Sequence, residues 1–249
     1  MEKRDYSDVY TKKELELNRR LFEECIRDKA DRDKIESLLK AGADPLGGID
    51  GDYGEHLWHI YGEVLCESQD TKSVNIPMIT ELFLKHGMDI DNPKIPYDNE
   101  DSLNPMWDFA FVLNENSVHA LKMLLDNGLS ADSAGIMWSH AAQDINFSPE
   151  EQNDAFWEYE RTWFMKATML CASYDHILEN DPALQEYICC STNSFDIHNF
   201  RNWDDFYYEF NITDSEVTPD FYKTIVHICR KSDKSVVWTI RAGFGDGEA

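Results

Sequence analysis

The side chains that could bind a calcium ion lack the spacing that a calcium site needs. Asp50-Gly51-Asp52 begins like a calcium loop, but an EF-hand loop counted from Asp50 requires a glycine at its sixth position and a glutamate at its twelfth. Those positions hold Glu55 and Tyr61. We therefore expect no calcium ion at this stretch.

Histidine and cysteine pairs lead to the same conclusion for zinc. His56 and His59 are three residues apart, whereas the His-Glu-x-x-His motif needs a spacing of four with a glutamate after the first histidine. Cys189 and Cys190 precede His198 but lack the Cys-x-x-Cys spacing of a zinc site. We expect neither a metal ion nor a cofactor.

Signatures of catalysis are missing as well. The sequence contains no Gly-x-Ser-x-Gly elbow, no phosphate-binding P-loop and no dinucleotide fingerprint. Pairs of carboxylates are common, but in a chain with 48 acidic residues a pair by itself indicates nothing. We expect a non-enzymatic protein without catalytic residues.

Negative charge is concentrated in the middle of the chain. The net charge is −25, and residues 41–160 contribute −19 of it with 23 acidic and 4 basic residues, whereas residues 1–40 hold 11 of each sign. Such a field repels nucleic acid and anionic membranes and favours a basic partner. An acidic surface that only keeps the protein soluble is the alternative.

The sequence also bears on the cellular compartment. The first ten residues, MEKRDYSDVY, contain no apolar signal segment, and no apolar run approaches the roughly 20 residues of a membrane helix. The six cysteines are scattered, and several fall on apolar faces of expected helices. We expect them to be reduced, buried thiols in a cytoplasmic protein.

One phrase recurs three times and organises the N-terminal half of the chain. Residues 34–44 read KIESLLKAGAD, residues 78–91 read MITELFLKHGMDID, and residues 120–132 read ALKMLLDNGLSAD. Each predicts the end of a helix closed by a glycine in the left-handed conformation. The closing residues Gly42, Gly87 and Gly128 are 45 and 41 positions apart, a period typical of stacked helical repeats.

The phrase resembles the second helix and exit turn of an ankyrin repeat, in which a Leu-Leu helix end precedes Gly-Ala-Asp. The run Gly42-Ala43-Asp44 matches this pattern, and the two later copies are drifted. The first helix of the family begins with Thr-Pro-Leu-His-x-Ala, of which NPMWDFA at residues 104–110 is a variant. An apolar residue followed by an aromatic one recurs at this place, at Leu21-Phe22, Leu57-Trp58, Met106-Trp107 and Met137-Trp138.

The resemblance covers roughly residues 15–146 and implies a mainly α fold. We expect an ankyrin-like α-solenoid of about four helix pairs in residues 1–147, the first and last pair being atypical. Thr11 and Glu14 predict a capping box at the first helix, and Asp31 or Asp33 predicts the start of the second. Residues 67–77 are expected to form an inserted loop.

Residues 148–249 predict a C-terminal extension that caps the stack. Ser148-Pro149 with Glu150 and Glu151 favours a helix start, and apolar spacing carries this helix to about Glu179. A shorter helix to about Cys189 and a loop at residues 191–202 follow. Three runs of β-branched and aromatic residues then predict a small antiparallel β meander, with residues 243–249 frayed.

Two sets of residues are candidates for binding a partner. In ankyrin repeats the start of the first helix lies near the concave groove, so Trp58, Trp107 and Trp138 would line that groove. Alternatively, the rings pack as core residues between repeats. Acidic residues of the finger loops between repeats form the second set, and they either trap basic side chains or only solubilise the surface: Asp50, Asp52, Asp98, Glu100 and Asp101.

These observations favour a scaffold that binds another protein, one with a basic surface. A sharper alternative is an inhibitor or immunity-type protein that masks a basic enzyme such as a nuclease. An alternative from a different class is an enzyme whose site lies where the repeats meet the extension, near His198, Trp203, Asp204 and Asp205, because clefts form at such junctions. A structural spacer without a partner is a further alternative.

Overall fold

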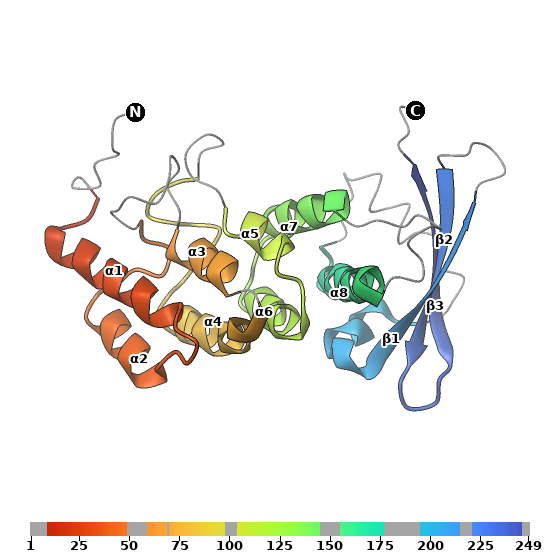
Figure 1. The fold of residues 1–249 in the computed structure, drawn as a ribbon, viewed down its shortest axis with the longest axis horizontal. Coiled ribbons are helices and arrows are strands. Elements are labelled where there is room, and N and C mark those ends of the chain that lie inside the picture. Colours follow the sequence, from red (N-terminus) through yellow and green to blue (C-terminus); the bar gives the residue numbers. More distant parts are fainter. Residues whose placement is uncertain are drawn as a thin grey trace. The chain divides into compact units, whose positions relative to one another are not determined.

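A computed structural model of the chain describes residues 9–48, 59–68, 70–97, 104–144, 155–176, 195–214 and 221–245. Across these residues the protein is mainly helical and has a small three-stranded antiparallel sheet. The chain divides into two units, Met1–His140 and Ala141–Ala249 (Figure 1). The predicted boundary between residues 147 and 148 lies outside the described residues.

The helices of the first unit form two rows, visible in Figure 1. We call α1 (Lys12–Cys25), α3 (Ile60–Glu67), α5 (Met106–Ala110) and α7 (Ala131–Asp144) the first row, and α2 (Arg32–Lys40), α4 (Ile76–Lys85) and α6 (Glu115–Asp126) the second. Within the second row α2 packs on α4 and α4 on α6, and within the first row α1 packs on α3 and α3 on α5. The last residues of α7 belong to the second unit.

The first two helices begin as the sequence predicts. The Thr11 hydroxyl accepts a hydrogen bond from the Glu14 amide at 3.3 Å, and the Glu14 carboxylate accepts one from the Thr11 amide at 2.8 Å. This reciprocal pair confirms the capping box. Asp31 caps α2 by accepting hydrogen bonds from the amides of Asp33 and Lys34.

The three helices of the second row end in the same turn. Gly42, Gly87 and Gly128 have φ angles of 105°, 88° and 93°, which confirms the predicted left-handed glycines. At the first turn the amide of Gly42 donates to the Leu39 carbonyl and that of Ala43 to the Leu38 carbonyl, and the same two bonds recur at the other two turns. This is the Schellman motif, and the residue after each glycine is buried in the core, at Ala43, Met88 and Leu129.

The insertion before α4 differs from the prediction. Instead of a loop throughout residues 67–77, the chain forms a 3-10 helix, η1 (Asp70–Asn75), that leads directly into α4. Pro77 lies in the first turn of α4, where its missing amide removes no hydrogen bond. The Asn75 side chain donates to the carbonyls of Arg27 and Asp28, at 3.1 and 3.3 Å, and so holds the insertion against the turn between α1 and α2.

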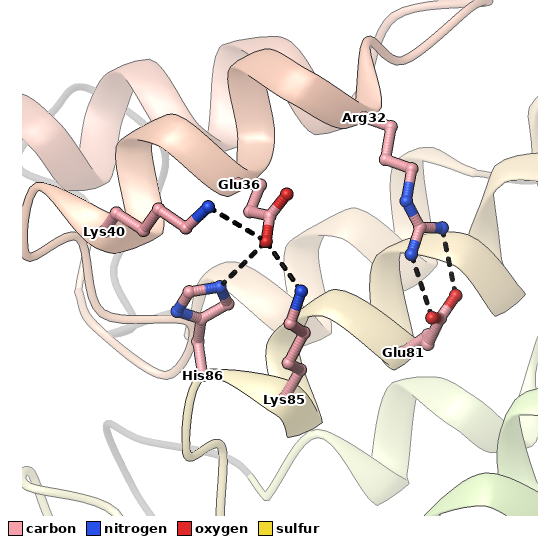
Figure 2. A network of polar contacts seen from close by, with 6 residues as sticks. All are labelled: Arg32, Glu36, Lys40, Glu81, Lys85 and His86. Carbon is pink, nitrogen blue, oxygen red and sulfur yellow. Dashed lines mark hydrogen bonds and ion pairs between the residues drawn. The ribbon is translucent and has the colours of Figure 1, made fainter.

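Ion pairs align α2 with α4 across the second row (Figure 2). Arg32 donates twice to the Glu81 carboxylate, at 3.0 and 2.8 Å. Glu36 accepts from Lys85 at 2.7 Å and lies 3.1 Å from the Lys40 ammonium. Hydrogen bonds from these two lysines lower the pKa of Glu36 to about 2.

The second unit places a helix beside the sheet. It contains α8 (Ala155–Ala172), the 3-10 helix η3 (Ile197–Asp205) and the strands β1 (Phe206–Asp214), β2 (Phe221–Arg230) and β3 (Val236–Gly245), paired in the order β1-β2-β3. The predicted antiparallel meander is therefore confirmed. Tyr208, Ile228 and Trp238 are neighbours across the three strands. All three side chains are buried in the core of this unit, and α8 packs on η3 and β1.

Three predicted boundaries in this unit are wrong. Helix α8 ends at Ala172, not near Glu179, because Asp175 takes a φ of 63° and the His176 amide bonds back to the Cys171 carbonyl. Residues 197–205 form η3 instead of a loop, and β3 continues to Gly245. The predicted helix start at residues 148–151 and the short helix to Cys189 lie outside the described residues.

Candidate partner-binding face

Most of the predicted partner-binding residues lie outside the residues that the structure describes. Trp58, Asp50, Asp52, Asp98, Glu100 and Asp101 lie outside the described residues. Trp138 lies in the middle of α7 with 5% of its surface exposed, which agrees with the core interpretation for this ring. Trp107 is half-buried in α5, and its ring contacts that of His140 on α7, with the centroids 3.3 Å apart.

The residues of the alternative enzyme site have structural contacts inside the second unit. The His198 ring nitrogen Nδ1 lies 3.0 Å from the Ser173 carbonyl at the end of α8. Asp204 accepts from Lys231 at 2.7 Å, and Trp203 is buried. Asp205 lies at the edge of an open hollow of about 540 Å³ that Asn199, Asn202 and Arg230 also line. These contacts join η3 to α8 and to the turn between β2 and β3.

A buried carboxylate lies between α3 and α5. Only 4% of the surface of Asp108 is exposed. Its Oδ1 accepts a hydrogen bond from the Cys66 thiol at 3.2 Å. Its Oδ2 lies so close to Gly62 that a Cβ atom there would be 2.5 Å away. Because no side chain fits between that backbone and the carboxylate, Gly62 is what allows Asp108 to occupy this place.

Two further carboxylates lie on α3, the helix that Asp108 contacts. Glu63 and Glu67 are one helical turn apart on α3, and Glu63 is half-buried. Burial, and to a smaller extent the charges of Asp108 and Glu67, raise the pKa of Glu63 to about 7. Burial also raises the pKa of Asp108 to about 6, although the thiol hydrogen bond opposes this. Within the described part of the chain, no basic side chain contributes to either shift.

Partly exposed aromatic rings lie at α5. Trp107 and Phe111 are one turn apart at α5, and 51% of the Phe111 surface is exposed. The Asp108 carboxylate contacts α3, whereas the Trp107 ring contacts His140 on α7.

Sequence reasoning singled out Trp107 but not the carboxylates of Glu63, Glu67 and Asp108. The available signal was Glu63 and Glu67 at a spacing of four in a helix whose other residues are mostly apolar. Like charges at that spacing destabilise a helix, so their presence calls for a reason outside the helix itself. The approach of Asp108 from α5 carries no local signal, because it depends on how the two helices pack.

The described residues give no sign of a metal centre or a membrane segment. Among them, no group of three or more histidine, cysteine, aspartate or glutamate side chains could hold a metal ion. No helix in the described ranges has both the length and the apolar character to cross a bilayer.

Comparison with known proteins adds no assignment. The chain matches no protein-family model, no curated protein and no solved structure.

Proposed function

We propose that the first unit is a divergent ankyrin-like stack that serves as a scaffold for binding another protein. The recurrence of the Schellman turn at Gly42, Gly87 and Gly128 carries this proposal. Because each second-row helix ends with the same backbone geometry, the chain leaves successive helices in the same direction. Units that repeat in this way stack side by side and present their first helices along one continuous face.

The ion pairs of the second row support the same architecture. Arg32 pairs with Glu81 and Glu36 with Lys85, and each pair is 49 positions apart. This separation is the 45-residue interval between Gly42 and Gly87 plus about one helical turn. Equivalent surfaces of α2 and α4 therefore lie side by side, as neighbouring repeats require.

The charge of the chain supports a basic partner. Residues 41–160 carry −19, and this field speeds the association of a cationic protein and makes it sensitive to salt. A scaffold of this kind binds with its surface and needs no pocket for a small molecule. If the partner is a basic enzyme that loses its activity in the complex, the scaffold acts as an inhibitor.

Affinity capture with the full chain tests the proposal. The tagged protein is incubated with native lysate at low salt, eluted with stepped salt, and the released proteins are identified by mass spectrometry. We expect one basic protein that rebinds saturably when purified, with a Kd that rises with salt. Partners that are acidic or neutral, or binding that does not saturate, would contradict the proposal.

A further inference from the structure

The 3-10 helix η3 has three sides, because a helix of this type has three residues per turn and side chains three positions apart lie on the same side. On the first side Phe200 and Trp203 are buried in the core of the second unit. On the second side the His198 ring nitrogen Nδ1 and the Arg201 Nε both contact the Ser173 carbonyl, each at 3.0 Å. Packing therefore explains two of the three sides of η3.

The third side of η3 lines the open hollow of about 540 Å³. Asn199, Asn202 and Asp205 follow one another at intervals of three on this side, and all three are exposed. The backbone bends at Asn202, where φ is −96° and ψ is 50°, but the three residues line the same hollow. None of the three side chains makes a hydrogen bond or ion pair within the described part of the chain, so their polar groups are available to a ligand.

The end of β2 and the turn after it complete the hollow. The Lys231 amide donates a hydrogen bond to the Asp205 carbonyl at 2.8 Å, which fixes this turn against η3. The Arg230 guanidinium lies 6.0 Å from the centre of the Phe195 ring, and both residues line the hollow. The hollow therefore places an aromatic ring among polar side chains that the fold holds in position.

The charges around the hollow select an uncharged ligand. Arg230 pairs with Asp233 at 3.3 Å and Lys231 with Asp204 at 2.7 Å, while Asp205 adds one further negative charge. An anionic ligand would compete with these carboxylates and approach a chain whose net charge is −25. A cationic ligand would meet Arg230 and Lys231. Hydrogen bonding, rather than ion pairing, is therefore what the hollow offers.

We propose that this hollow is a carbohydrate-binding site, in which Asn199, Asn202 and Asp205 bond to the hydroxyl groups of the ligand. A hydroxyl both donates and accepts hydrogen bonds, an asparagine amide offers one group of each kind, and a carboxylate accepts. The ring of Phe195 offers an apolar surface for the C–H face of a sugar ring. A volume of about 540 Å³ is within the range of small-molecule sites. The site goes beyond the proposed scaffold function, since it lies in the second unit.

The test uses the full chain with a terminal tag and an array of immobilised neutral and acidic glycans. The neutral glycan that binds best is then titrated in free form by isothermal titration calorimetry. We expect saturable binding that high salt leaves unchanged, because no ion pair forms. The double variant Asn199→Ala/Asn202→Ala should weaken binding by about tenfold, since it removes two polar partners. The matched control Asn211→Ala, at an exposed position of β1 outside the hollow, should bind as the unmodified chain does.

The absence of binding to any neutral glycan would overturn the inference, as would equal affinity of the unmodified chain and the double variant. Binding confined to acidic glycans and abolished by high salt would overturn it too, because the cations Arg230 and Lys231 would then hold the ligand. If the alanine variant fails to fold, Asn199→Asp/Asn202→Asp keeps the shape of both side chains, removes their amide donors and should still weaken binding. The scaffold proposal is tested separately, since its protein partner binds in a salt-sensitive way.

Discussion

Replacing Asp108 by asparagine should stabilise the first unit at neutral pH. Burial raises the pKa of Asp108 from 3.8 to about 6. Between these two pH values the folded protein binds more protons than the unfolded chain, so the free energy of unfolding falls as the pH rises. Above about pH 6 the full loss of stability caused by the buried charge remains. A shift of about two pKa units at about 1.4 kcal/mol each corresponds to about 3 kcal/mol.

The asparagine variant is suited to isolate this penalty. Its side-chain oxygen can still accept the hydrogen bond from the Cys66 thiol, which Asp108 accepts at 3.2 Å. Its shape is the same, so the contact with Gly62 is kept, and the charge is gone. With 4% of the Asp108 surface exposed, solvent offers the carboxylate little compensation.

Urea unfolding of the full chain measures the effect at two pH values. We expect Asp108→Asn to be more stable by about 3 kcal/mol at about pH 8 and by about half of that at about pH 5, where the carboxyl of the folded protein is already mostly protonated. Asp33→Asn, at an exposed position on α2, should give no stabilisation at either pH. A loss of stability on Asp108→Asn at pH 8, or a gain that is equal at both pH values, would refute the reasoning.

Three further changes test other parts of the structure. Gly87→Ala places a side chain at a φ of 88°, with no atom within 4 Å of the new Cβ. It should therefore lower stability only through backbone strain, by about 1–2 kcal/mol in thermal unfolding. An equal loss with Gly87→Asn would contradict this. Gly62→Ala should lower stability more, because its Cβ would lie 2.5 Å from the Asp108 carboxylate. If this contact is the cause, the loss of stability should be smaller when Asp108→Ala is also present. Hydrogen bonds from Lys85 and Lys40 lower the pKa of Glu36 to about 2. In high salt, NMR should show this carboxyl titrating nearer its ordinary value. An unchanged midpoint would speak against these ion pairs.

Features set by one residue type at one position could be predicted from the sequence. Only glycine adopts a φ near 90° without strain, so Gly42, Gly87 and Gly128 mark three helix ends, and the structure confirms the left-handed turn at each. The Thr11 capping box and the alternation that predicts the β meander are local in the same sense.

Features that depend on packing could not be predicted. The apolar spacing of α8 continues past Ala172, but the helix ends there because Asp175 adopts the left-handed conformation. Aspartate does so only occasionally, and the sequence around it shows no other stop signal. The meeting of Asp108 with Gly62 and Cys66 joins residues more than forty positions apart, so only the packed helices reveal it.

The raised pKa values of Asp108 and Glu63 mark the carboxylates between α3 and α5 as unfavourable to the fold. A buried acid without a cation destabilises a fold, and the second row of this same unit shows that the chain places lysine and arginine against its acids elsewhere. Natural proteins retain such unfavourable groups mostly where function requires them.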